Sequence, residues 1–119
     1  MMRLSDELRN RTKRFASTII RLYVALPRSR KEVDVIGHQL LRSGTSVAAH
    51  AREASRARST AEFCSKLDGL LQEADESHLW MELLHEDCGV TDDQLNWLHQ
   101  ETGELIGIFT TMVSKLRKS

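Results

Sequence analysis

The sequence predicts an all-α protein, with residues 1–119 forming one domain folded as an antiparallel, up-down-up-down, left-handed four-helix bundle. Three observations predict this fold. One proline and six glycines in 119 residues are too few to supply the turns of a β-fold. Apolar or small residues recur three and four positions apart in four long segments, which is the periodicity of packed helices. The connections between the segments are short, so consecutive helices should be antiparallel neighbours.

The first helix is expected at about residues 6–26. Phe15 and Ile19 belong to the stripe of residues that faces the core. Ser5, followed by two acidic residues, suits a helix N-terminus because it can cap free amides and the acidic charges complement the helix dipole. Pro27 should end the helix, because proline lacks an amide donor and clashes with the preceding turn.

The other three helices are expected at about residues 30–57, 60–88 and 92–117. Each begins with a capping-box pattern, in which a Ser or Thr and a Glu or Gln three positions later satisfy each other's free amides. The three boxes are Ser29 to Glu32, Ser59 to Glu62 and Thr91 to Gln94. Gly89 follows the third helix at the place where a left-handed C-cap favours glycine.

The net charge is zero, but the two halves of the chain differ. Residues 1–58 carry 13 Arg and Lys against 5 Asp and Glu, a net charge of +8, whereas residues 59–119 carry 4 against 12, a net charge of −8. In one interpretation, the basic half packs against the acidic half. In the other, the basic half presents its charge to an anionic partner such as RNA.

The two cysteines, Cys64 and Cys88, favour an intracellular location. On one helix they would lie about 36 Å apart, too far for a disulfide. Free thiols and the lack of a secretory leader favour the reducing cytoplasm. No apolar run approaches the roughly 18 residues of a membrane span. We therefore expect a cytoplasmic protein that does not enter a membrane.

No catalytic pattern stands out. The chain has no Gly-rich phosphate loop, no nucleophile elbow and no Cys-x-x-Cys. Glu82 and His85 have the Glu-x-x-His spacing of di-iron bundles, but such a site takes one pair from each of two helices. We expect no enzymatic activity, no metal and no cofactor.

Polar residues interrupt the core-facing stripes near the middle of the bundle. Pairing antiparallel helices about their loops places Ser43 level with Ala74, and Ser77 level with Thr102. We predict a structural polar layer there, in which Arg42 pairs with Glu73 or Glu76 between the second and third helices. Its members are Arg42, Ser43, His50, Glu53, Glu73 and Glu76.

A set of large apolar residues lies off these stripes: Leu79, Trp80, Leu83 and Trp97. Long side chains or the chain termini could cover them, or they could form a subunit interface. We favour the interface, because aromatic anchors are typical of such surfaces. The opposite charges of the two halves also suit a head-to-tail contact between copies, which closes into a ring if the rotation allows.

The alternative function is nucleic-acid binding by a basic surface of the first two helices. The candidate residues are Lys13, Arg14, Arg21, Arg52, Arg56 and Arg58. They would contact phosphates, so binding should weaken steeply as salt rises. Few aromatic residues accompany them, so stacking on the bases of a single strand is poorly supported.

The second and third helices carry a distinctive pattern: the run QLLRS from Gln39 to Ser43, followed by Ser46, Ala49, Glu53-Ala54, Ser59, Glu62-Phe63, Lys66-Leu67, Glu73-Ala74, Glu76 and Trp80. This pattern resembles the 23S ribosomal RNA intervening-sequence protein family. The resemblance covers about residues 10–113 and implies a cytosolic bundle that assembles as a homopentameric ring without a known catalytic residue. The family usually has Asn where this chain has His50, so a polar network that uses this position must be rearranged here.

A more distant similarity is to the accessory variability protein of diversity-generating retroelements, which implies nucleic-acid binding through a basic ring surface. We therefore expect a non-enzymatic, homo-oligomeric scaffold or interaction module whose partner is itself or another protein. The alternative is a ring that binds RNA.

Overall fold

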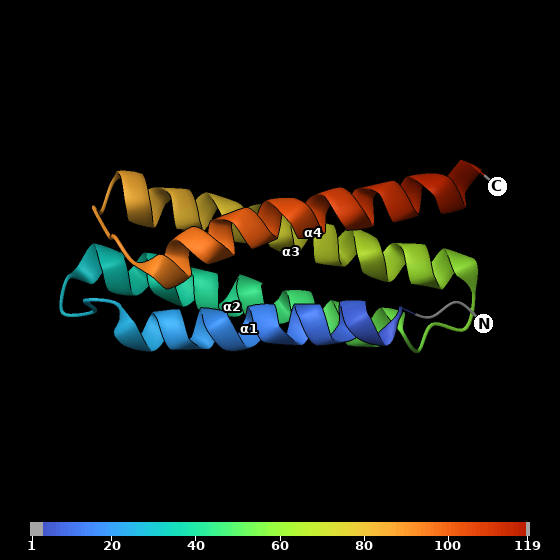
Figure 1. The fold of residues 1–119 in the computed structure, drawn as a ribbon, viewed down its shortest axis with the longest axis horizontal. Coiled ribbons are helices and arrows are strands. Elements are labelled where there is room, and N and C mark those ends of the chain that lie inside the picture. The colour runs from blue at the N-terminus through green and yellow to red at the C-terminus, as the bar shows by residue number, and fades with distance from the viewer. Residues whose placement is uncertain (1–3, 119) are drawn as a thin grey trace.

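The structure, a computed structural model, describes residues 4–118, which form four α-helices and no strand. They are α1 (Asp6–Ala25), α2 (Lys31–Ala54), α3 (Thr60–Glu86) and α4 (Asp93–Lys118). Successive helices run in opposite directions along a bundle of 48 × 21 × 20 Å (Figure 1). The predicted all-α, up-down-up-down four-helix bundle is confirmed.

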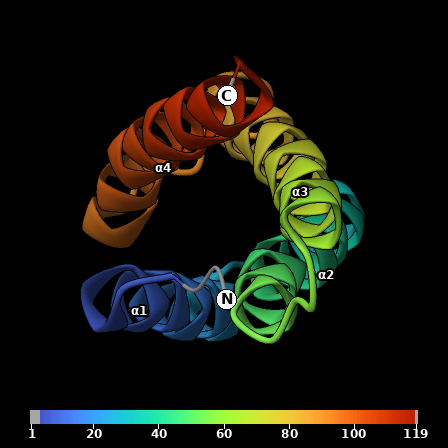
Figure 2. The same cartoon turned by 90° about the vertical axis from the view of Figure 1, so that its right-hand side faces the viewer.

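The four helices follow one another around the bundle axis. Seen from the end that carries both termini, they form an arc from α1 through α2 and α3 to α4 (Figure 2). The most extensive contact joins α2 to α3, and the smallest joins α1 to α4. The α1–α4 interface is therefore the least extensive of the four interfaces between neighbouring helices.

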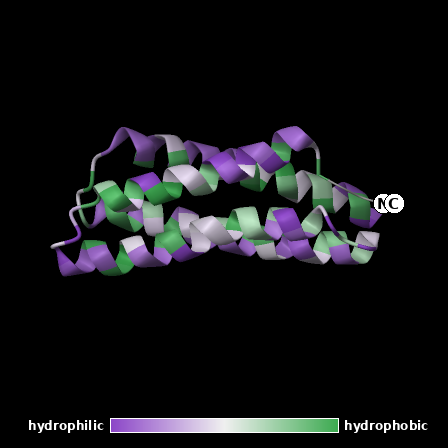
Figure 3. Cartoon of the chain, turned by 90° about the horizontal axis from the view of Figure 1, so that it is seen from below, coloured by the Kyte–Doolittle hydropathy of each residue, from purple (hydrophilic) through white to green (hydrophobic). Residues whose placement is uncertain are grey.

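The core contains three aromatic residues, Phe15, Phe63 and Phe109, together with aliphatic side chains from all four helices. Figure 3 shows hydrophobic and hydrophilic residues alternating along the helices, as expected where one face of each helix is buried. Within residues 4–118, no helix is both long enough and apolar enough to cross a membrane.

Several helix ends lie where the sequence places them. The hydroxyl of Ser5 accepts a hydrogen bond from the amide of Leu8 at 3.2 Å, and that of Ser59 accepts one from the amide of Glu62 at 3.0 Å. Helix α1 ends just before Pro27. Gly89 follows α3 with a φ of +69°, a left-handed conformation that glycine adopts without strain.

Two of the three predicted capping boxes are wrong. Helix α2 has Arg30 rather than Ser29 at its N-cap, and no side chain caps it. The carboxylate of Glu32, which the box requires, instead accepts a hydrogen bond from Arg30 Nε at 2.8 Å. Before α4, Asp92 rather than Thr91 caps, since its Oδ1 accepts from the amide of Gln94 at 2.7 Å. Asp caps a helix at least as well as Thr, so two adjacent candidates made the position ambiguous.

Helix α2 ends at Ala54, earlier than the expected residue 57. Beyond it the chain tightens, because the amides of Arg56 and Ala57 bond to carbonyls only three residues back. This turn buries Ser55 and Ala57 beside the core.

Candidate functional site

The interface between α2 and α3 holds the predicted ion pair. A guanidinium nitrogen of Arg42 lies 3.4 Å from a carboxylate oxygen of Glu73 and another lies 3.8 Å from Glu76. The pKa of the Glu76 carboxyl is raised, chiefly by a hydrogen bond with the Glu73 carboxyl, then by desolvation and by the like charge of Glu73. Arg42 therefore neutralises two neighbouring carboxylates at the edge of this interface.

Behind this ion pair, two buried hydroxyls meet across the interface. Ser43 Oγ and Ser77 Oγ are 2.8 Å apart, and Ser77 also donates to the carbonyl of Glu73. The expected register placed Ser43 opposite Ala74, three residues away. A helical side chain leans toward the N-terminus of its own helix. Across antiparallel helices the leans are opposite, so Ser43 reaches Ser77, whose Cα lies one turn beyond the level of Ser43.

The hydroxyl of Thr102 also contacts a residue one turn away from the one expected to lie level with it. It lies 3.6 Å from Sδ of Met81, one turn beyond the expected Ser77, and donates to the carbonyl of Leu98 at 2.6 Å. The hydroxyls of Ser77 and Thr102 each donate to a carbonyl four residues back on their own helix. They do not form one continuous layer.

His50 and Glu53, on the next turns of α2, contact α3 separately. The imidazole of His50 packs on Gly69, where an added Cβ would lie 2.8 Å from a ring carbon. Its Nδ1 is buried without a hydrogen-bond partner among the described residues. Glu53 accepts a hydrogen bond from Lys66 Nζ at 2.9 Å, which lowers the pKa of Glu53 and raises that of Lys66. His50 and Glu53 therefore form two contacts, not one network.

The most buried ion pair among residues 4–118 joins α1 to α4, and sequence reasoning missed it. Arg11 donates two hydrogen bonds of 2.8 Å to Glu101 and a third of 2.8 Å to Glu104. The side chain of Glu101 is only 9% exposed. These carboxylates raise the pKa of Arg11 well above its ordinary value, chiefly through the hydrogen bond to Glu101. In the sequence, Arg11, Glu101 and Glu104 each stand next to a core-facing residue, and this placement could have predicted the pair.

The predicted interface residues fall on two different faces. Leu79 is 48% exposed on α3, and Trp80 and Leu83 are half-buried beside it in the sequence. Trp97 lies instead at the α1–α4 interface, where the guanidinium of Arg14 covers its ring at 5.1 Å from the centroid. We define the α3 patch as Leu79, Trp80 and Leu83.

The predicted nucleic-acid residues are divided among three places. Lys13, Arg52 and Arg56 line a groove of about 740 Å³ between α1 and α2. Arg14 and Arg21 border a smaller groove beside Trp97, and Arg58 pairs with Glu62 at 3.5 Å. The six residues therefore do not line a single groove.

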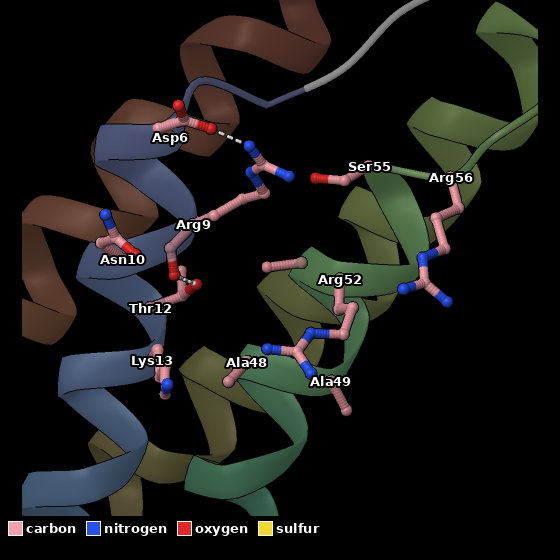
Figure 4. A pocket seen from close by; sticks show the side chains of 11 residues that line it. Asp6, Arg9, Asn10, Thr12, Lys13, Ala48, Ala49, Arg52, Ser55 and Arg56 are labelled. Carbon is pink, nitrogen blue, oxygen red and sulfur yellow. Dashed lines mark hydrogen bonds and ion pairs between the residues drawn. The ribbon is translucent and has the colours of Figure 1, made fainter.

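We define the α1–α2 groove as the larger of the two. Besides Lys13, Arg52 and Arg56 it is lined by Arg9 and Asp6, which are ion-paired, and by Ser55 and small residues including Ala48 and Ala51. Figure 4 shows Lys13 on α1 and Arg52 on α2 on opposite sides of this groove, with the Ser55 hydroxyl directed toward α1. Arg9 and Ser55 were missed because neither belongs to the predicted basic set or the predicted polar layer.

Histidines gather at the α3–α4 interface. The rings of His78 and His99 lie 4.2 Å apart between centroids, and His99 Nε2 is 3.8 Å from Glu82. Within residues 4–118, no three His, Cys, Asp or Glu side chains are arranged to hold a metal ion. Cys64 and Cys88 are both buried and unbridged.

Comparison with known proteins agrees on one family. A family model described as 23S rRNA-intervening sequence protein matches residues 6–111. A solved structure of a protein with unknown function from the S23 ribosomal protein family, from Bacteroides thetaiotaomicron VPI-5482, is 35% identical in sequence. The similarity covers 88% of this chain and 96% of that one, with a TM-score of 0.79. No curated protein matches.

Proposed function

Because the chain belongs to the 23S rRNA-intervening sequence protein family, we propose that it is a non-catalytic bundle that assembles with copies of itself into a scaffold. The α3 patch carries this proposal. Leu79 and Leu83 are one helical turn apart, as are Trp80 and Leu83, so the three share a face of α3. An exposed leucine beside a partly exposed tryptophan is the kind of apolar anchor that subunit interfaces use.

The charges of the bundle support a head-to-tail contact. Helix α3 carries mostly acidic residues around the patch and no arginine, whereas α1 and α2 together carry six of the twelve arginines of the chain. A contact between different faces of two copies generates a closed ring when the rotation allows. The resemblance to the family favours a ring of five.

Sedimentation velocity tests this proposal. The wild type should sediment as an assembly several times heavier than the 13.6 kDa chain. Leu79→Lys should shift it to the monomer at micromolar concentration, because a charge in the interface is costly to desolvate. Thr110→Lys is the control, since Thr110 is exposed on α4, a helix that this head-to-tail contact does not use. A monomeric wild type, or equal behaviour of both variants, would contradict the proposal.

A second function, RNA binding through the phosphate backbone, is favoured by the three cations gathered in the α1–α2 groove. Phosphate contacts release counterions, so affinity for RNA should fall steeply with salt, with a slope near the number of contacts. The measurement is a filter-binding titration against structured and single-stranded RNA at several salt concentrations. No binding at low salt would remove this function and leave the scaffold untouched.

A further inference from the structure

The α1–α2 groove concentrates positive charge that the rest of the bundle does not neutralise. From the described part of the chain, four cationic side chains line it against one carboxylate, that of Asp6, which pairs with Arg9. Lys13, Arg52 and Arg56 make no ion pair with any described residue. Elsewhere two arginines that face other helices are bound to carboxylates, Arg11 to Glu101 and Arg42 to Glu73. The groove thus holds about three uncompensated charges.

A buried hydroxyl lies in the same groove without a partner. Ser55 is 4% exposed, and its Oγ makes no hydrogen bond within the described part of the chain. A buried hydroxyl without a hydrogen-bond partner destabilises the fold, whereas an alanine at this position would not. A ligand oxygen in the groove would supply the missing acceptor.

The lining of the groove indicates what kind of ligand fits. Among residues 4–118 no aromatic ring lines it, so this part of the chain offers no stacking surface there for a base or a sugar. Ala48 and Ala51 supply small side chains that leave space between the cations. Guanidinium and ammonium groups with one hydroxyl match the oxygens of a phosphate. A volume of about 740 Å³ suffices for a group the size of a di- or triphosphate.

The dipole of α2 offsets part of the positive charge in the groove. Arg52 and Arg56 lie at the C-terminal end of α2, where exposed carbonyls carry about half a negative charge. Part of their charge therefore offsets the dipole rather than attracting an anion. That offset is smaller than the three uncompensated cations, so a positive potential remains in the groove.

We propose that the α1–α2 groove is a phosphate-binding site. Arg52, Arg56 and Lys13 bind the phosphate oxygens, and the Ser55 hydroxyl donates a hydrogen bond to one of them. This inference deepens the second function proposed above, because the phosphates can belong to a nucleic-acid strand. They can equally belong to a free polyphosphate, and the experiment separates the two sources.

Isothermal titration calorimetry with inorganic pyrophosphate tests the site at low salt. The wild type should bind one pyrophosphate per chain with saturation. Arg52→Gln should weaken binding about tenfold or more, because it removes a charge-assisted hydrogen bond. Lys31→Gln is the matched control, since Lys31 is an exposed cation on α2 outside the groove without an ion pair in the described chain, and it should change affinity less than about twofold.

Ser55→Ala separates a binding role from a structural one. It removes an unpartnered buried hydroxyl, so thermal stability should stay the same or rise. Affinity for pyrophosphate should nevertheless fall about fivefold, the loss of one hydrogen bond. A lack of saturable binding, or equal losses in Arg52→Gln and Lys31→Gln, would overturn the site. Unchanged affinity in Ser55→Ala would overturn the role of the hydroxyl.

Competition with a single-stranded oligouridylate identifies the source of the phosphate. Displacement of pyrophosphate, lost in Arg52→Gln, assigns the groove to a nucleic-acid strand. Pyrophosphate binding without displacement assigns the groove to free polyphosphate, which supports the site and contradicts RNA binding through it. An oligonucleotide that binds regardless of Arg52 and Ser55 overturns the assignment of the groove to a nucleic-acid strand and leaves RNA binding by another surface standing.

Discussion

Removing Arg11 should destabilise the bundle far more than removing other ion-paired arginines. Arg11→Met keeps most of the side-chain volume but leaves the carboxylate of Glu101, 9% exposed, without its cation. Breaking a fully buried pair costs about 3–5 kcal/mol, because a charge is left desolvated. The side chain of Arg11 is 27% exposed, so water reaches the site and about 2–3 kcal/mol is the expected loss. The melting temperature should fall by about 10 °C.

Arg117→Met provides the matched control. Arg117 also makes two hydrogen bonds to one carboxylate, that of Asp68, at 3.2 and 2.7 Å. That pair is about half exposed on both sides, so its removal should have an effect within about 0.5 kcal/mol. The comparison thus varies burial while the geometry of the pair stays similar.

Urea denaturation followed by circular dichroism measures both losses, at two protein concentrations so that any assembly is recognised. The double variant Arg11→Met, Glu101→Leu should recover most of the lost stability, since no buried charge is left unpaired. If Arg11→Met costs no more than Arg117→Met, the α1–α4 interface does not depend on this pair and the reasoning is wrong.

Three further changes test particular contacts by the same denaturation assay. Gly69→Ala should destabilise the wild type by about 1 kcal/mol through overlap with His50, but stabilise a His50→Asn background, where helix propensity alone decides; the same sign in both would contradict the contact. Gly107→Ala should stabilise by about 0.5–1 kcal/mol, because nothing lies within 4 Å of an added Cβ. Lys66→Met should lower the free energy of unfolding slightly above pH 4.5, the ordinary pKa of Glu53, because the ionised carboxylate loses its cation. Below the lowered pKa of Glu53 the carboxyl is protonated, and the substitution should cost nothing. A cost that persists in acid would mean that packing, not charge, is lost.

The architecture could be predicted because it depends on local signals. Pro27 and Gly89 act through their own backbone, and Ser59 through an amide three residues away. Such signals need no knowledge of the neighbouring helix. Where two capping candidates stood side by side, as at Thr91 and Asp92, local chemistry did not decide between them.

The candidate sites were harder to predict because they depend on which faces meet. A glutamate next to a core-facing stripe is typical of an exposed flanking position, and only Arg11 on α1 makes the burial of Glu101 possible. Likewise Lys13, Arg14 and Arg21 belong to one helix, but only Lys13 faces α2 and its arginines. A linear list of basic residues therefore combined groups that the helix faces separate.

The uneven charge of the two halves bears on both assembly and phosphate binding. Much of the charge is used within the bundle, where Arg11 and Arg42 bind carboxylates of the acidic half. The charge of the α1–α2 groove remains, and it could attract either a phosphate or the acidic α3 of another copy. These two uses exclude each other at one groove.

Linkage distinguishes the two uses of the groove. If α3 of a second copy covers the groove, pyrophosphate must compete with assembly, and adding it should shift the sedimenting species toward the monomer. If copies instead join through the α3 patch away from the groove, pyrophosphate should bind the assembly without dissociating it. Sedimentation of the wild type and of Leu79→Lys, each with and without pyrophosphate, therefore decides whether the basic groove serves assembly or a ligand.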